Sequence, residues 1–191
     1  MEKIVRRNFI REAVLACFFV SGISGLIYEV IWTKMLGLVF GNTTFAISTV
    51  LTAYMAGLAL GSYLAGRYAD KIKNTLKSYA ILEIGIGVYC FLIPFLISMM
   101  GDLYLSIQKL FDLSFYPSSL VRFAFSFILL LIPTTLMGAT LPIFSRFYVE
   151  QNEQFGHGVG RVYATNTFGA FLGTILSGFI LIVYLGVRPT I

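Results

Sequence analysis

The chain has 191 residues, of which 58% are hydrophobic and only 12% are charged. Soluble domains average about 45–50% apolar and 25% charged residues, so this composition excludes an ordinary soluble domain and indicates an integral membrane protein. The net charge of +5 comes from basic residues that flank apolar runs instead of forming one patch, which argues against a nucleic-acid partner.

Five apolar runs are long enough to cross a membrane as helices, because a hydrocarbon core of roughly 30 Å needs about 20 apolar residues. The sequence therefore predicts an all-α, polytopic membrane protein with one transmembrane domain and no soluble catalytic domain. Residues 102–116 carry a helical apolar stripe, which predicts an interfacial helix, with a surface loop as the alternative. The predicted spans are approximately residues 12–38, 43–66, 78–100, 120–147 and 159–186.

Basic residues between the spans predict the orientation. With the N-terminus inside, most of the 14 lysines and arginines fall on the cytoplasmic side, so the positive-inside rule gives an N-in, C-out topology. The cytoplasmic set is Lys3, Arg6, Arg7, Arg11, Arg67, Lys71, Lys73, Lys77, Arg146 and Arg161, and the outer set is Lys34, Lys109, Arg122 and Arg188.

In the first span, the stretch GLIYEVIWTK (25–34) places Glu29 among apolar residues. An ionisable residue inside a span costs roughly 2.5–3.5 kcal/mol by insertion scales, so it needs a partner, a water-filled cavity or neutralisation. We expect Arg122, at the start of the fourth span, to be the partner of Glu29. As an alternative, Glu29 with the rings of Tyr28 and Trp32 would bind an ammonium group.

In the second span small residues recur every four positions, and the fifth span repeats the pattern. Such ladders predict close packing between helices, or between two copies of the chain. Gly57, Gly61 and Gly66 have the same offsets as Gly169, Gly173 and Gly178, which suggests an inverted three-helix repeat and a sixth helix beginning near residue 188. The ladders are Ala53, Gly57, Gly61, Ala65 and Ala69, and Thr165, Gly169, Gly173 and Ser177.

The segment GRYADKIKN (66–74) follows the second span and matches part of the inner-loop motif of the major facilitator superfamily (MFS), G-x-x-x-D-[RK]-x-G-[RK]. Gly66, Asp70 and Lys71 match, but Lys73 stands where the motif has its second glycine. Asp70 is therefore a candidate latch, with a solvated turn as the alternative.

Glu83 is the acid of the third span, roughly 9 Å from the cytoplasmic end when counted from Lys77. Tyr163, Asn166 and Thr167 of the fifth span lie at comparable depth and are predicted to hydrogen-bond it. Two interpretations of the intramembrane acids stay open. They either fix helix register through buried polar contacts, or face a cavity where they bind a cation or relay protons.

Pro133 and Pro142 lie in the fourth span, where each removes a backbone donor and can kink the helix. We expect Thr134, Thr135 and Thr140 to satisfy the freed carbonyl groups. A broken helix of this kind either lines a transport site or simply adjusts the shape of the bundle.

Four blocks together resemble the membrane portion of fused MFS/spermidine-synthase-like proteins. The resemblance implies a half-MFS-like helix bundle, which in longer members of that family accompanies a soluble aminopropyltransferase domain with a Rossmann-like fold. The blocks are SGISGLIYEVIWTKMLGLVFGNT (21–43), GLALGSYLAGRYAD (57–70), PTTLMGATLPIFSR (133–146) and VGRVYATNTFGAFLGTILSGF (159–179).

Two functions follow as expectations. The first is a membrane domain in the cytoplasmic (inner) membrane that anchors or regulates a polyamine synthase, with a soluble aminopropyltransferase-like partner. The second is a small MFS-like transporter or binding protein for an amine or other small solute, for which the ladders would pair two copies as a homodimer. An intramembrane enzyme ranks last, because the sequence has no nucleophile–base pair, no H-E-x-x-H motif and no metal-ligand cluster, and we expect no cofactor or metal.

Overall fold

The computed structural model describes residues 2–41, 44–112, 114–149 and 155–190, and their side chains except at 2–8, 39–40, 46, 70, 149, 155 and 188. Within this part of the chain the fold is helical and contains no strand. The long helices are α1 (Glu2–Phe40), α2 (Thr44–Tyr68), α3 (Thr75–Phe111), α4 (Phe115–Val149) and α5 (Phe155–Ile175). A π-helical segment (Leu176–Leu181) joins α5 to the short α6 (Ile182–Tyr184), and 3₁₀ turns occupy Ala69–Lys71 and Arg188–Thr190.

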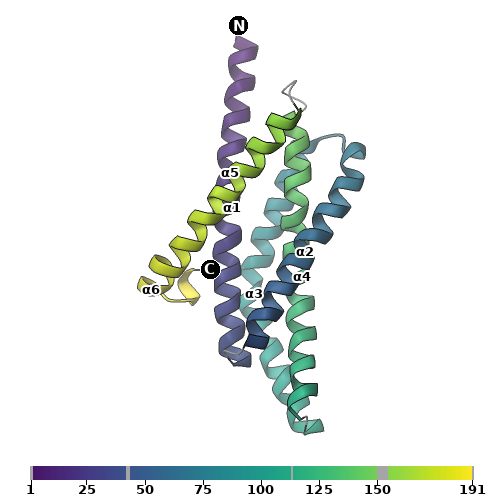
Figure 1. The fold of residues 1–191 in the computed structure, drawn as a ribbon, viewed down its shortest axis with the longest axis vertical. Coiled ribbons are helices and arrows are strands. Elements are labelled where there is room, and N and C mark those ends of the chain that lie inside the picture. Colours follow the sequence, from purple (N-terminus) through teal and green to yellow (C-terminus); the bar gives the residue numbers. More distant parts are fainter. Residues whose placement is uncertain (1, 42–43, 113, 150–154, 191) are drawn as a thin grey trace.

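Five described helices are long and apolar enough to cross a membrane, which confirms the all-α, polytopic fold class. Successive helices run in opposite directions along the bundle, and the first residues of α1 project beyond the other helices (Figure 1). The membrane-length segments within them are Phe9–Leu38, Ile47–Tyr68, Thr75–Phe111, Phe115–Tyr148 and Gly156–Tyr184.

The predicted interfacial helix at 102–116 does not form a separate element. α3 continues to Phe111, and α4 already begins at Phe115. Asp112 ends α3 in the left-handed conformation (φ 44°), and its N–H bonds back to the carbonyl of Gln108. The apolar stripe of this segment thus belongs to the last turns of α3, because that helix continues to Phe111.

Glycines bring two pairs of helices into backbone contact. On α2, a Cβ at Gly57 would collide with Thr134 of α4, and one at Gly61 would collide with the backbone of Thr135. A Cβ at Gly138 of α4 would in turn meet the backbone of Leu58. Only glycine lets the two backbones approach this closely, so α2 and α4 form one tightly packed pair.

The second pair consists of α1 and α5. A Cβ at Gly169 would meet the carbonyl of Phe19, and a Cβ at Gly173 would meet that of Ile23. Gly66 and Gly178, which share the predicted repeat offsets, have nothing within 4 Å of the added atom. The ladder glycines Gly57, Gly61, Gly169 and Gly173 therefore pack against other helices of the same chain. These four positions are not available for pairing two copies of the chain.

Pro133 leaves a carbonyl of α4 without its helical donor. A helical N–H bonds to the carbonyl four residues earlier, so the missing N–H of Pro133 frees the oxygen of Leu129. The hydroxyl of Tyr89, on α3, donates to this oxygen at 2.9 Å. A neighbouring helix thus replaces the lost backbone bond.

Pro142 is treated in the same way. It frees the carbonyl of Gly138, which accepts a hydrogen bond from Ser62 Oγ of α2 at 2.9 Å. The threonines predicted for this task instead bond to other carbonyls of α4, because a Thr hydroxyl reaches the carbonyl three or four residues before it. Their acceptors are Leu130 and Leu131 for Thr134, Leu131 for Thr135 and Met137 for Thr140.

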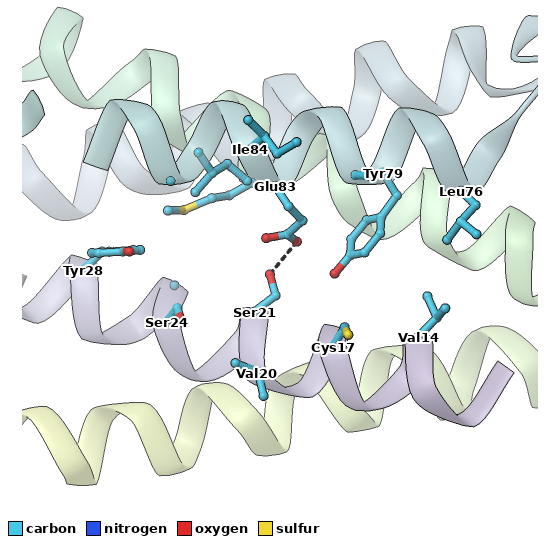
Figure 2. Close-up of a pocket in the computed structure, with 15 residues that line it drawn as sticks. Val14, Cys17, Val20, Ser21, Ser24, Tyr28, Leu76, Tyr79, Glu83 and Ile84 are labelled. Atoms are coloured by element: carbon cyan, nitrogen blue, oxygen red, sulfur yellow. Dashed lines mark hydrogen bonds between the residues drawn. The ribbon is translucent and has the colours of Figure 1, made fainter. Parts of the chain in front are cut away.

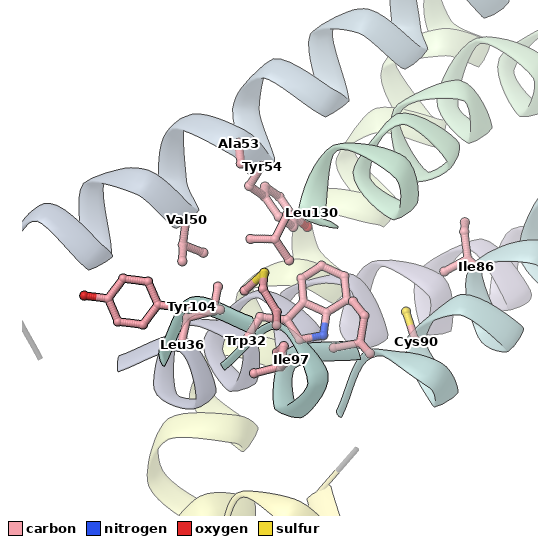
Figure 3. Packing of buried hydrophobic residues seen from close by; sticks show 12 residues of the cluster. Trp32, Leu36, Val50, Ala53, Tyr54, Ile86, Cys90, Ile97, Tyr104 and Leu130 are labelled. Atoms are coloured by element: carbon pink, nitrogen blue, oxygen red, sulfur yellow. The ribbon is translucent and has the colours of Figure 1, made fainter. Parts of the chain in front are cut away.

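Two apolar clusters fill the bundle. Toward the end where α1 begins, Phe18 of α1 stacks on Phe144 of α4 with ring centroids 4.4 Å apart. The other cluster gathers side chains of α1 to α4 around Trp32, which is fully buried, as Figure 3 shows. These clusters fix the helices that form the walls of the cavity described next.

Candidate functional site

A cavity of about 510 Å³ lies between α1 and α3, with Met137 of α4 on its wall. Each of the two helices contributes one face, since the lining residues recur at spacings of three and four along both helices. The α1 side consists of Val14, Cys17, Val20, Ser21, Ser24, Gly25 and Tyr28, and the α3 side of Leu76, Tyr79, Ala80, Glu83, Ile84, Ile86 and Gly87.

The polar centre of the cavity is a hydrogen bond between its two walls. Ser21 Oγ of α1 donates to a carboxylate oxygen of Glu83 on α3 at 2.7 Å. The hydroxyl of Tyr79 points toward this pair from one helical turn away (Figure 2). Among the side chains that the structure describes, Glu83 has no lysine, arginine or histidine in an ion pair. An ionised Glu83 therefore presents a negative charge to the cavity that these side chains do not neutralise.

Tyr28 of α1 lies at the end of the cavity that is farther from Leu76 (Figure 2). Its ring stacks on Trp32 at a centroid distance of 5.7 Å and an interplanar angle of 11°. Trp32 itself has an exposed fraction of 0% and is not part of the cavity wall. Trp32, which was predicted to contact a ligand, instead packs against the ring of Tyr28 outside the cavity.

Glu29 lies outside this cavity, although it is adjacent to Tyr28 in sequence. One residue along a helix rotates the side chain by about 100°, so the two neighbours face different directions. The predicted partner Arg122 lies elsewhere: its guanidinium donates to the Tyr104 hydroxyl at 2.6 Å and lies over that ring, 4.8 Å from the centroid. The predicted Glu29–Arg122 pair is therefore not formed.

Asn166 lies against α1 at Gly22 and is not among the residues that line the cavity with Glu83. A Cβ at Gly22 would collide with the carbonyl of Asn166, which places this part of α5 directly against the α1 backbone. Tyr163 and Thr167 are exposed. Among the described residues the predicted hydrogen bonds from α5 to Glu83 are not formed, and Ser21 of α1 donates to this carboxylate instead.

Two further predicted residues, Lys71 and Asp70, belong to the segment that follows α2. Lys71 lies in the 3₁₀ turn after α2, with its ammonium 5.3 Å from the centroid of the Tyr68 ring. The side chain of Asp70, the predicted latch, is outside the described part of the structure. Among the described residues no three histidine, cysteine, aspartate or glutamate side chains form a metal-binding group.

Glu83 and Tyr28 were predicted from the sequence as site residues and line the cavity, whereas the cavity residues Cys17, Ser21 and Ser24 were not predicted. These three small side chains and Tyr28 follow each other at spacings of four, three and four, which is the periodicity of one helix face. This spacing is the feature of the sequence that could have indicated a shared helix face. Serines in a membrane helix commonly bond to their own backbone, so the stripe alone does not indicate a cavity.

The described part of the chain is thus a polytopic helical membrane bundle, with five membrane-length helices and a carboxylate-containing cavity. The chain is 26% identical, over 177 residues, to two curated proteins of Ralstonia nicotianae, polyamine aminopropyltransferase 2 and polyamine aminopropyltransferase 1. The match covers 93% of this chain but only 31% and 30% of the relatives, so the chain spans about a third of their length. No family model and no solved structure matches the chain.

Proposed function

We propose that this chain is a membrane domain that anchors or regulates a polyamine aminopropyltransferase, as in fused MFS/spermidine-synthase-like proteins. The observation that carries the proposal is the extent of the match, because 93% of the chain aligns with less than a third of each aminopropyltransferase. The matched third corresponds here to a bundle of membrane-length helices. Aminopropyl transfer would then be carried out by a soluble, aminopropyltransferase-like partner domain or protein.

Cell fractionation tests this proposal. Aminopropyltransferase activity, assayed with putrescine and decarboxylated S-adenosylmethionine, is expected in the cytoplasmic-membrane fraction of cells that contain the chain. Removing the chain should release the activity into the soluble fraction or lower it. An activity whose amount and location do not respond to the chain would contradict the proposal.

A second candidate function is the binding or transport of an amine. It is supported by the cavity between α1 and α3, where Glu83 has a hydrogen bond from Ser21 and no described cationic partner. A carboxylate that is costly to place within a span is commonly retained for a ligand, an ion or a proton. The aromatic ring of Tyr28 at one end of the cavity suits an ammonium group as well.

Flux measurements in proteoliposomes test the second candidate. Uptake of a labelled monoamine is expected to fall at least about tenfold in Glu83→Gln, because that change removes the charge that attracts the cation. Glu29→Gln is the matched control, since Glu29 is an intramembrane acid outside the cavity. Equal losses in both variants, or none in either, would contradict a role for the cavity.

A further inference from the structure

We infer that the cavity between α1 and α3 accepts a singly charged, amphipathic amine that enters from the bilayer, and that it does not accept a polyamine. The inference rests on the second candidate function and specifies its ligand. It combines three features of the cavity, namely its charge, the acceptor atoms around that charge, and the side chains at its rim.

The charge of the cavity matches one ammonium group. Among the lining residues that the structure describes, Glu83 is the one acidic side chain, and none of them is a lysine, arginine or histidine. A polyamine carries several ammonium groups, and each one beyond the first would lose its water without gaining a carboxylate. Burying an unpaired charge is costly, so the physical chemistry favours a monocation.

The acceptor atoms are arranged for an ammonium group. A primary ammonium has three N–H donors. The carboxylate of Glu83 and the hydroxyl oxygen of Ser21, which are 2.7 Å apart, supply acceptors, and the Tyr79 hydroxyl points to the same place (Figure 2). The bond from Ser21 uses its hydrogen and leaves its lone pairs available to the ligand.

The rim of the cavity is apolar and exposed. Val20 of α1 has an exposed fraction of 57%, and Leu76 and Ile84 of α3 have exposed fractions of 36% and 66%. In a membrane-spanning helix such side chains face acyl chains, because lipid tails are as apolar as leucine. An alkyl tail bound to the ammonium therefore leaves the cavity between these side chains and stays in hydrocarbon.

The depth of Glu83 is consistent with this route. The residue lies six positions after Lys77, roughly 9 Å along α3 from that basic side chain. This depth places Glu83 inside the span, on the side nearest the boundary between the cytoplasmic head groups and the acyl chains. An amphipathic amine already partitions to that boundary, with its ammonium toward the head groups and its tail in the core.

The chain carries its own probe of occupancy. Cys17 is exposed and lines the cavity one turn from Ser21, whereas Cys90 is buried. In nanodiscs, uncharged N-ethylmaleimide is expected to modify Cys17 and leave Cys90 intact. Labelling of Cys90 then reports loss of the fold, so every sample contains its own folding control.

The experiment compares the rate of Cys17 modification with dodecylamine, dodecanol and spermidine. We expect dodecylamine to slow the reaction about tenfold at roughly nine times its Kd, since protection scales as 1 + [L]/Kd. Dodecanol, with the same tail and no charge, and spermidine, with charges and no long tail, should leave the rate unchanged. Protection should be lost in Glu83→Gln and kept in Glu29→Gln.

Each other outcome has a definite meaning. Protection by spermidine that depends on Glu83 overturns the inference and keeps amine binding. Equal protection by dodecanol, or protection that survives Glu83→Gln, shows partition without a site and overturns it as well. No protection by any probe, with Cys90 unlabelled, overturns both the inference and the second candidate function. If Glu83→Gln unfolds the protein and Cys90 becomes labelled, the comparison of dodecylamine, dodecanol and spermidine on the unaltered chain still tests the inference.

Discussion

Glu83 is joined to α1 through the hydroxyl of Ser21, and this contact crosses the seam between two helices that the cavity otherwise separates. Hydrogen bonds to charged groups contribute about 1.5–3 kcal/mol in soluble proteins, whereas interhelical bonds in membranes average nearer 0.6 kcal/mol. A value of about 1 kcal/mol is therefore reasonable for this bond.

Ser21→Ala is expected to lower the free energy of unfolding by about that amount, roughly 1 kcal/mol, because Glu83 loses its donor. Equilibrium unfolding in mixed micelles measures the change. Ser24→Ala is the matched control, since Ser24 lines the same face of α1 one turn further on and does not bond to Glu83. Equal effects of the two substitutions would show that the bond contributes nothing specific.

The site was only partly predictable at the residue scale. Glu83 stands out in the sequence because an acid within a span is rare and costly. The pairing of Glu29 with Arg122 failed because depth in the membrane does not say which way a helix face points. Arg122 instead bonds to Tyr104, and such a choice depends on the rotation of each helix in the bundle.

At the scale of elements, glycine contacts hold α2 to α4 and α5 to α1. Gly61→Ala is expected to destabilise the protein by about 1–3 kcal/mol, because its Cβ would enter the backbone of Thr135. Gly66→Ala, on the same helix, should be neutral or stabilising by up to about 1 kcal/mol, since it has open space and alanine favours helix.

Thermal unfolding of the two glycine variants in detergent, with the unaltered chain alongside, measures this difference. A Gly66→Ala protein as unstable as Gly61→Ala would contradict the close-packing account, because Gly66 has open space for a Cβ and alanine favours helix. The same comparison applies to Gly169→Ala and Gly178→Ala on the fifth membrane segment, because Gly169 faces the backbone of α1 and Gly178 has open space.

Pro133 of α4 gives a second test at this scale. Tyr89→Phe should cost about 1 kcal/mol, because the Leu129 carbonyl freed by Pro133 loses its donor. In a Pro133→Ala background the backbone N–H returns, so Tyr89→Phe should cost much less. A double-mutant cycle on the free energy of unfolding measures this coupling, and additive effects would contradict the compensation.

The elements themselves were largely predictable, since their number and apolar character follow from runs of about 20 apolar residues. The helix ends were not. The apolar stripe in residues 102–116 predicts an interfacial helix, because such a stripe looks the same in a separate helix and in the last turns of a long one. The donors for Leu129 and Gly138 were also missed, because Tyr89 and Ser62 reach them from other helices and such contacts leave no local signal.

At the scale of the whole molecule, the distribution of basic residues predicts that both the N-terminus and the turn between α2 and α3 face the cytoplasm. Alkaline phosphatase, which is active only outside the cytoplasm, should be active when fused after residue 112 and inactive when fused after residue 73. The reverse pattern would contradict the proposed orientation. Activity at both sites would mean that the chain has no fixed topology.

The proposed role as a membrane domain for polyamine synthesis is tested most directly by extracting the protein in a gentle detergent from its native cell and determining the masses of everything that co-elutes. The proposal predicts an aminopropyltransferase-like protein in the same complex, or one covalent product that contains both this chain and such a domain. A species near 21.2 kDa, or twice that mass, with no such companion would contradict it and leave amine binding as the remaining candidate.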